Sequence, residues 1–409
     1  QPAQCQRTLR LAEFVRRNLM TFVIMEGMKA LDALLEQDRV ALCGPWRAKG
    51  NKGDPVRWGS ADGRLVMGGQ RVIMRKPRVR QGSNEVELPS WAQFADEDPL
   101  DERTFEQLVL GVSTRNYERS LDDLPDDLCG HGASKSAASR RFVETTSKQL
   151  SQWTNQDLSK HGLVVVMLDG IVVAKHTVIV ALGIDETGKK HALGLWIGET
   201  ENAVVCGELL DSLVERGLDP LSPYLFVIDG SKALRKAIQT RFGARSLVQR
   251  CQRHKRENIL GHLPKSLHVS VRKVLSDAFG SPSRKTAKER LLALAKQLME
   301  DHPDAAASIK EGLDEMLTLK DMKLPVALEK TLSTTNPIEN LNGSIRTVSR
   351  RVKRWRHGAM IKRWVAAGIL EAQKGFHRVK GKKGMSLLIE ALRKNADRVD
   401  SLDRQQEAA

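Results

Sequence analysis

Two aspartates in the middle of the chain have the residue type and the setting of metal-binding carboxylates. Asp169 follows the apolar run 163–168, Asp229 follows the apolar run 225–228, and a glycine comes after each of them. Apolar runs of this length are typical of strands buried on both faces of a sheet. If the two strands are neighbours, both carboxylates meet at one sheet edge, where a third acid would complete a cage for two divalent cations that promote phosphoryl transfer. Hard oxygen donors favour Mg²⁺, with Mn²⁺ as its substitute.

The third acid has two candidates. The segment 333–337 predicts the start of a helix, with Asn336 as N-cap and Pro337 at the first position, which places Glu339 at the third. Glu339 is then either a capping-box residue that bonds back to Asn336 or the third metal ligand. Glu257, which follows the last expected strand, is a rival for the same role.

Other polar residues near the expected sheet have simpler interpretations. Cys251 and His254 form a Cys-x-x-His pair, but with no second pair nearby a zinc site is disfavoured, and packing with a hydrogen bond is preferred. A possible accessory role stays open, in which His254 orients a phosphate or a metal-bound water beside Asp229. Asp185 lies in a hairpin turn and is expected to be structural. A single Asp-Gly pair after a strand is also a common turn.

The elements that must position these residues predict an α/β fold with a mixed sheet. The pattern is βββαβαβ, with strands at 163–168, 171–184, 190–197, 225–228 and 247–248 and helices at 202–216 and 231–242. Three antiparallel strands would come first, and crossover helices would add two parallel ones. This order matches the ribonuclease H-like fold, in which the strands before Asp169 and Asp229 are neighbours.

The remaining chain suggests further domains around that core. Residues 1–40 read as a helix, 64–67 and 70–74 as a hairpin, and a polar linker follows to about residue 103. Gln1 is no initiator residue, and Met25 offers an alternative start. The expected domains are an N-terminal region of unknown role (1–100), a helix-turn-helix-like DNA-binding domain (101–160), the ribonuclease H-like core (161–254 and 331–375), an all-α insertion (255–330) and a basic helical tail with frayed final residues (376–409).

Charge indicates a polyanionic partner. The chain of 409 residues carries 66 Lys and Arg against 50 Asp and Glu, a net charge of +16. Between residues 346 and 383 there are thirteen basic residues and one acid, with smaller clusters at 75–80 and 250–256. Because so few acids compensate this repulsion, nucleic acid is favoured over a solvated helix face. Aromatic residues make up only 4% of the chain, which favours duplex DNA over stacking on single strands.

Two groups of residues are candidates for contacting DNA. The segment 134–142 could form a recognition helix with small polar and basic side chains along one side, although a plain packing helix is equally compatible. A second group lies on the helix that carries Glu339 or just beyond it. The predicted contacts are Ser136, Arg140, Arg141, Arg346, Arg350, Arg351, Lys353 and Arg354.

Composition also limits the class of protein. At 41% hydrophobic residues the chain can bury a core, so disorder throughout is excluded. No apolar run reaches the roughly 18 residues of a membrane span, and no signal peptide is evident. The five cysteines are odd in number and scattered, which is typical of a reducing compartment. The expected location is therefore a reducing cytosol.

Taken together, these motifs resemble the Mutator-type transposases of bacterial insertion sequences. The resemblance rests on Asp169-Gly170, Asp229-Gly230, Cys251-x-x-His254 and the segment 334–342, which contains Asn-Pro-Ile-Glu-Asn. It runs from about residue 103 to 374, and the segment 111–115 resembles the family's helix-turn-helix. Residues 1–100 show no family pattern that we recognise.

The resemblance implies a catalytic triad and a reaction. Asp169, Asp229 and Glu339 would be the catalytic and metal-binding residues, with Cys251 and His254 matching a further family motif. The implied activity is metal-dependent cleavage at transposon ends and joining of the freed 3′-hydroxyl to target DNA, by a homodimer or larger assembly on terminal inverted repeats. The alternatives are a ribonuclease H-like DNA nuclease or resolvase, and a non-catalytic DNA-binding regulator derived from a transposase.

Overall fold

The computed structural model of this chain describes residues 19–47, 53–67, 70–96, 106, 108–111, 135–198, 202–350, 352 and 354–407. The chain divides into two compact units, residues 1–148 and 149–409. Much of the domain expected to hold the helix-turn-helix (101–160), including residues 112–134, lies outside the described residues, so that expectation stays a prediction. Helix α5 (Lys135–Thr154) covers the segment proposed as a recognition helix.

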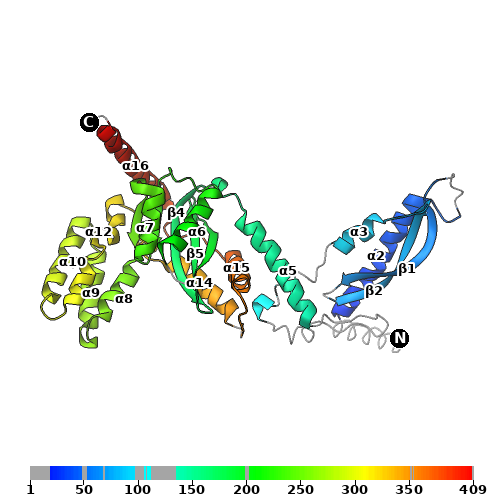
Figure 1. Cartoon of the computed structure of the whole chain (residues 1–409), viewed down its shortest axis with the longest axis horizontal. Coiled ribbons are helices and arrows are strands. Elements are labelled where there is room, and N and C mark those ends of the chain that lie inside the picture. Colours follow the sequence, from blue (N-terminus) through cyan, green and yellow to red (C-terminus); the bar gives the residue numbers. More distant parts are fainter. Residues whose placement is uncertain are drawn as a thin grey trace, which may run out of the picture. The chain divides into compact units, whose positions relative to one another are not determined.

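The first unit is a small antiparallel sheet with helices. Its elements are α2 (Leu19–Cys43), β1 (Val56–Met67), β2 (Gln70–Gln81), β3 (Asn84–Val86) and α3 (Pro89–Asp96), and the sheet order is β1-β2-β3. The expected hairpin is confirmed and is longer than predicted, and its strands run alongside α2 (Figure 1). The region expected to be a polar linker holds β3 and α3 instead, because Leu88 and Trp91 are buried in the core of this unit.

The second unit contains the expected mixed sheet. Its strands are β4 (Leu163–Val173), β5 (His176–Asp185), β6 (Lys190–Gly198), β7 (Leu225–Ile228) and β8 (Leu247–Arg250). Their order across the sheet is β6-β5-β4-β7-β8. The pairs β6–β5 and β5–β4 are antiparallel, whereas β4–β7 and β7–β8 are parallel. The fold class α/β and the five strands are therefore confirmed.

One strand boundary was predicted wrongly. Strand β4 does not end before Asp169 but continues to Val173, and a two-residue turn at Ala174 and Lys175 leads into β5. Both turn residues have positive φ angles, 52° and 69°, as a tight type I′ hairpin requires. Beyond Asp169 the strand keeps only β5 as a neighbour, because β7 ends at Ile228. The Asp-Gly pair thus lies within a strand, where sequence reasoning placed a strand end.

Helices cover both faces of this sheet. Helices α6 (Ala203–Glu215) and α7 (Lys232–Phe242) pack on the face that presents Val166, Leu168 and Phe226. The opposite face presents Val165, Met167 and Val227. It is covered by α13 (Val326–Leu332), α14 (Asn336–Ser349), α15 (Gly358–Lys374) and α16 (Met385–Glu407). A sheet buried on both faces explains why its central strands are continuous apolar runs.

The chain between β8 and α13 is helical, as expected for the insertion. It comprises α8 (Gln252–Gly261), α9 (His268–Phe279), α10 (Arg284–Leu298), α11 (Pro303–Lys310) and α12 (Leu313–Met316). These helices share a hydrophobic core of their own, and Figure 1 shows them gathered beside the sheet. Short 3₁₀ turns occur at Ser159–His161, Gly243–Arg245, Lys265–Leu267, Thr318–Met322 and Lys382–Gly384.

The C-terminal residues are more ordered than predicted. The sequence suggested that the final residues of the tail are frayed, but α16 continues to Glu407. Arg245 forms an ion pair with Asp400, and the Asn395 side chain donates to the backbone oxygens of Ala244 and Arg245. These polar contacts anchor α16 beyond its apolar half. Within the described ranges, none of the helices carries an apolar stretch of the length that crossing a bilayer needs.

Candidate active site

The register of the sheet aligns three of the residues singled out in the sequence. Leu168 pairs with Ile228 across the parallel strands β4 and β7, and Ile228 pairs with Arg250 of β8. Asp169, Asp229 and Cys251 are each the next residue along. Neighbouring strands lie about 4.7–4.9 Å apart, so the Asp169 and Asp229 backbones are held side by side at the carboxyl end of β7.

Asp169 occupies a buried and polar environment. Its side chain is only 8% exposed, and the Asn342 amide donates a hydrogen bond of 2.7 Å to Oδ2. Burial, together with repulsion from the carboxylates of Asp229 and Glu339, raises the pKa of Asp169 to about 6. The charge of His254 and the Asn342 hydrogen bond oppose the shift. Three acids close enough to repel one another in this way form an anionic centre.

The backbone after Asp229 is specialised for this position. Asp229 is half-buried, and its Oδ1 accepts a hydrogen bond of 2.9 Å from the backbone N–H of Ser231, the N-cap of α7. Gly230 has φ of +112°, and a Cβ placed there would lie 2.1 Å from Nε of Arg250. Only glycine meets both conditions without strain. At the end of β7 the aspartate therefore supplies a carboxylate, and the glycine after it supplies a backbone conformation that other residues cannot adopt without strain.

Glu339 reaches the same centre from the first turn of α14. The helix begins one residue earlier than expected, at Asn336, and its N-cap is Thr335 instead of Asn336. Accordingly, Glu339 does not bond back to Asn336. Its Oε1 accepts a hydrogen bond of 2.8 Å from the Thr335 hydroxyl, and its Oε2 accepts one of 3.0 Å from Arg253. Arg253 also donates to the Asn336 side chain at 2.9 Å. The predicted capping-box bond from Glu339 back to Asn336 is thus wrong, because Glu339 bonds to Thr335 instead.

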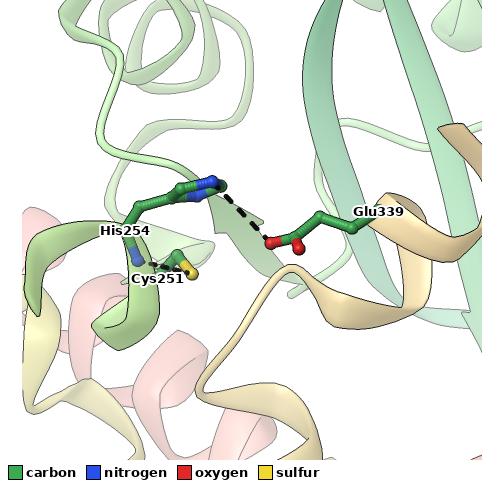
Figure 2. Close-up of side chains that lie close together, drawn as sticks. All are labelled: Cys251, His254 and Glu339. Carbon is green, nitrogen blue, oxygen red and sulfur yellow. Dashed lines mark hydrogen bonds and ion pairs between the residues drawn. The ribbon is translucent and has the colours of Figure 1, made fainter. Parts of the chain in front are cut away.

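Cys251 and His254 lie beside this carboxylate, as Figure 2 shows. The Cys251 sulfur caps α8 by accepting the backbone N–H of His254, and it also accepts the N–H of Thr335 at 3.4 Å. The Thr335 hydroxyl, which donates its proton to Glu339, lies 3.3 Å from the same sulfur. The His254 ring lies 3.8 Å from Glu339 Oε1. The interaction with the Cys251 side chain, supported by the charges of Glu339 and Asp169, raises the pKa of His254 to about 9.

The donor set decides which cation these residues could bind. One atom each from Cys251, His254 and Glu339 lie within 4.8 Å of one another. Burial of the Cys251 thiol is outweighed by hydrogen bonds from His254 and Thr335, which lower the pKa of the thiol, and the pKa of His254 is raised to about 9. These three donors fall short of the four protein ligands of a structural zinc site. The carboxylates of Asp169, Asp229 and Glu339 are hard donors that fit Mg²⁺ or Mn²⁺, and their mutual repulsion would be relieved by a cation.

Two other acids named in the sequence lie elsewhere. Glu257 is exposed on α8 and forms an ion pair of 3.7 Å with Arg272, so it does not contribute to the centre. Asp185 ends β5 and accepts hydrogen bonds from Thr187, Lys189 and His191, which agrees with the structural role expected for it.

Comparison with known proteins places this arrangement in a family. The model of the family "Transposase, Mutator family" matches residues 14–378, which is most of the chain. The chain belongs to the Mutator family of transposases. The resemblance stated from the sequence is thereby confirmed, and the match extends into residues 14–100, where no pattern was recognised.

Several relatives are similar along most of their length. The transposase for insertion sequence element IS6120 of Mycolicibacterium smegmatis is 28% identical over 249 residues, covering 58% of this chain and 72% of the relative. The transposase for IS256 in transposon Tn4001 of Staphylococcus aureus is 25% identical over 308 residues, covering 73% and 76%. The transposase for IS905 of Lactococcus lactis subsp. lactis is 25% identical over 349 residues, covering 83% and 84%.

In this Mutator-family chain the described residues among the proposed DNA contacts lie on α5, on α14 and in the segment that follows α14. Ser136 and Arg140 are exposed on α5, and Arg346 is exposed on α14. Arg350 and Arg354 follow α14 and are exposed too. The Arg141 side chain and the whole of Arg351 and Lys353 lie outside the described residues, so their contribution stays a prediction.

Sequence reasoning missed the residues that hold the carboxylates in place. Asn342, Thr335 and Arg253 make the hydrogen bonds to Asp169 and Glu339 described above. A signal for Asn342 did exist, because a residue three positions after Glu339 lies on the same face of a helix. No sequence signal pairs Arg253 with a carboxylate 86 residues away.

The basic cluster at 250–256 is also not one surface. Arg250 is nearly buried and Lys255 is fully buried, and both form ion pairs with Glu311, at 3.3 and 3.0 Å. Part of this cluster therefore stabilises the fold instead of contacting DNA.

Proposed function

We propose that the chain is an insertion-sequence transposase of the ribonuclease H-like type, which cuts a phosphodiester at the element's ends and joins the freed 3′-hydroxyl to target DNA. The observation that carries this proposal is the anionic centre of Asp169, Asp229 and Glu339 at the carboxyl end of β7. The strand order β6-β5-β4-β7-β8 supports the fold, and the matched family and the names of its relatives support the reaction.

The three carboxylates would hold two Mg²⁺ ions, with Asp169 and Asp229 binding both and Glu339 completing one site. Bound there, such ions activate a water or a 3′-hydroxyl and stabilise the leaving oxygen. The chain supplies the geometry. Asn342 fixes the Asp169 carboxylate, and Thr335 and Arg253 orient that of Glu339.

The chain also supplies positive charge for the DNA. The exposed Arg346 lies on the same helix as Glu339, and the exposed Arg350 and Arg354 follow that helix. These side chains would contact the DNA backbone close to the scissile phosphate. Because two ends must be joined to one target, we expect a dimer or a larger assembly on the DNA.

The test is cleavage and strand transfer by the full chain with DNA that carries the element's own ends. Wild type with Mg²⁺ should nick the end and should join a pre-cleaved end to target DNA. Asp169→Asn should lose at least about 10³-fold in rate, because it removes a ligand shared by both ions. Asp301→Asn, which changes an exposed aspartate, is the matched control and should retain activity.

The outcomes separate the alternatives. Cleavage without joining of a pre-cleaved end would indicate a nuclease or resolvase. Binding without any Mg²⁺- or Mn²⁺-dependent cleavage would indicate a DNA-binding regulator. Full activity of Asp169→Asn would refute the assignment of the centre.

A further inference from the structure

The hairpin of the first unit carries an unbalanced positive charge. Strands β1 and β2, residues 56–81, contain seven Lys and Arg and one acid, Asp62. Two of the cations are neutralised locally, because Arg57 pairs with Glu36 and Arg78 with Glu85. Among the described residues, four others have no carboxylate partner within ion-pair distance; these are Arg64, Arg75, Lys76 and Arg80. Net repulsion within one hairpin is therefore left uncompensated.

Part of this hairpin is a two-stranded ribbon with one free face. Strand β3 pairs only with residues 79–81 of β2, so the part of the hairpin nearer its tip has no third strand. The cross-strand pairs Leu65–Val72 and Gly63–Met74 share one face, which packs on the core of the unit and on Trp91. That face is therefore covered by the unit's own core and is not available to a partner.

The opposite face of the ribbon is exposed and basic. Directly opposed residues share a face, so Arg64 with Ile73 and Asp62 with Arg75 point away from the core. All four are exposed, and Ile73 retains 45% of its accessible surface. Arg64 and Arg75 are diagonal neighbours, which places their Cβ atoms roughly 7–8 Å apart. Arg75 donates a hydrogen bond to Ser60 across the strands, which orients its side chain on this face.

Exposed tryptophans of the same unit add to this pattern. Trp58 is 49% exposed and the Arg80 guanidinium lies 4.7 Å from its ring centre. Trp46 is 72% exposed and Arg57 lies 5.5 Å from its ring. Stacking holds the Arg80 guanidinium extended at a lower cost in side-chain entropy, which suits it to contact a phosphate, whereas Arg57 is already paired with Glu36.

We propose that the free face of the β1–β2 ribbon binds duplex DNA, with Arg64 and Arg75 contacting backbone phosphates. A two-stranded β-ribbon is one of the few elements whose width matches the major groove. The partner is a polyanion because the cations of this face lack carboxylate partners and binding would release counterions. This inference rests on the proposed function in that DNA is the substrate, and it assigns DNA contact to a region that the catalytic centre does not involve.

The test measures the salt dependence of binding. The full chain, in EDTA so that no cleavage occurs, is titrated against a fluorescent duplex of random sequence at 50–200 mM salt. Arg64→Ala/Arg75→Ala should lower the slope of log K against log salt by about 1.8, which corresponds to two phosphate contacts, and weaken binding roughly tenfold at low salt. Arg64→Lys/Arg75→Lys keeps both charges and should restore most of the slope, which excludes misfolding as the cause.

The matched control is Lys29→Ala/Arg78→Ala. This variant also removes two positive charges from the first unit, but Lys29 and Arg78 are already paired with carboxylates, those of Glu26 and Glu85. Its slope should stay close to that of wild type. Equal slopes for the two double variants would overturn the proposal, as would an effect seen only with single-stranded DNA. If wild type shows no cleavage but the slope difference is present, the proposed function fails and the ribbon assignment stands.

Discussion

At the scale of single residues, Asn342 is the most instructive side chain in the centre. It is almost fully buried on the inner face of α14, among Ile338, Leu341 and Ile345, where an apolar residue would be expected. Its amide nitrogen donates to Asp169, and its Oδ1 is buried without a hydrogen-bond partner among the described residues. A buried polar atom left unpaired costs stability, so the favourable interaction that Asn342 makes here is its hydrogen bond to the Asp169 carboxylate.

Asn342→Asp should therefore be severe. The substitution replaces the donor with a second carboxylate in contact with Asp169, which adds repulsion inside a buried site. We expect a loss of roughly 2–4 kcal/mol in the free energy of unfolding without divalent cations, equivalent to a fall in Tm of about 5–10 °C for a unit of this size. Mg²⁺ should recover part of this loss, because a cation offsets the added charge. Thermal unfolding with and without Mg²⁺ measures both effects.

The control for that variant is Asn340→Asp. Asn340 is exposed two residues earlier on the same helix, so the same change in charge should shift Tm by no more than about 1 °C. Equal shifts for the two variants would show that Asn342 does not act through Asp169.

At the scale of elements, the turn between β5 and β6 shows how a hairpin is fixed by one carboxylate. Asp185 accepts hydrogen bonds from the N–H groups of Thr187 and Lys189 and from the Thr187 hydroxyl, and its Oδ2 lies 2.8 Å from His191 Nε2. Burial raises the pKa of this carboxyl, but these hydrogen bonds outweigh burial and hold the pKa below the usual value for an aspartate. The charged form is therefore stabilised by folding.

The sign of the pH effect follows from that shift. A carboxyl with a lowered pKa in the folded state adds stability above its unfolded pKa, near 4, and loses that stability as pH falls through the folded pKa. Asp185→Asn should lower Tm by several degrees at pH 7, and the difference from wild type should narrow below about pH 4. Melting curves between pH 7 and pH 3 give the comparison, with the exposed Asp301→Asn as reference. A gap that stays constant with pH would mean that the charge of Asp185 contributes nothing.

Elements also show what the sequence could and could not predict. Strands 225–228 and 190–197 were predicted closely, because apolar runs and turn residues mark them. The continuation of β4 past Asp169 was missed because Gly170 looked like a stop, whereas the pairing of β4 with β5 extends the strand. The start of α14 was predicted one residue too late because asparagine is a common N-cap residue. In the structure the Asn336 side chain accepts a hydrogen bond from Arg253 instead of capping the helix.

The same distinction applies to the candidate site. The acids Asp169 and Asp229 could be singled out because each follows a run of apolar residues, whereas only the family resemblance favoured Glu339 over Glu257. The residues that orient them could not be found, because those hydrogen bonds join segments up to 173 residues apart in sequence. Long-range partners of this kind depend on how α14 packs on the sheet, which no local pattern encodes.

At the scale of the whole second unit, one carboxylate joins the helical insertion to the sheet. Glu311 follows α11 and pairs with Arg250 at the end of β8 and with the fully buried Lys255 of α8. The adjacent Gly312 has φ of +66°, and a Cβ there would lie 2.5 Å from Arg250 Nη1. The Arg250 side chain is thus enclosed by Gly230 on one side and Gly312 on the other, which ties the insertion to the strand that precedes Cys251.

Glu311→Gln should test that connection. It leaves three cations, Arg250, Lys255 and the more distant Lys232, without their shared counterion. We expect the free energy of unfolding to fall by roughly 1–3 kcal/mol, less than for a fully buried pair because Glu311 is partly exposed. Urea unfolding of the full chain measures the loss. Glu289→Gln, which neutralises an exposed glutamate of α10 with no ion pair among the described residues, should change stability by less than about 0.5 kcal/mol. Similar effects of both variants would mean that the shared ion pair is not a structural link.

The position of α14 so late in the chain has a consequence for protein synthesis. A ribosome releases β4, β7 and both aspartates long before the helices that carry Glu339 and that shield Val165, Met167 and Val227. Until α13 to α16 have emerged, this face of the nascent sheet is incompletely covered, a condition that favours chaperone binding and aggregation. Translation that stops within the insertion therefore yields a chain that has two of the acids but can neither bury its sheet nor assemble the third, so interrupted synthesis leaves no partly competent fragment.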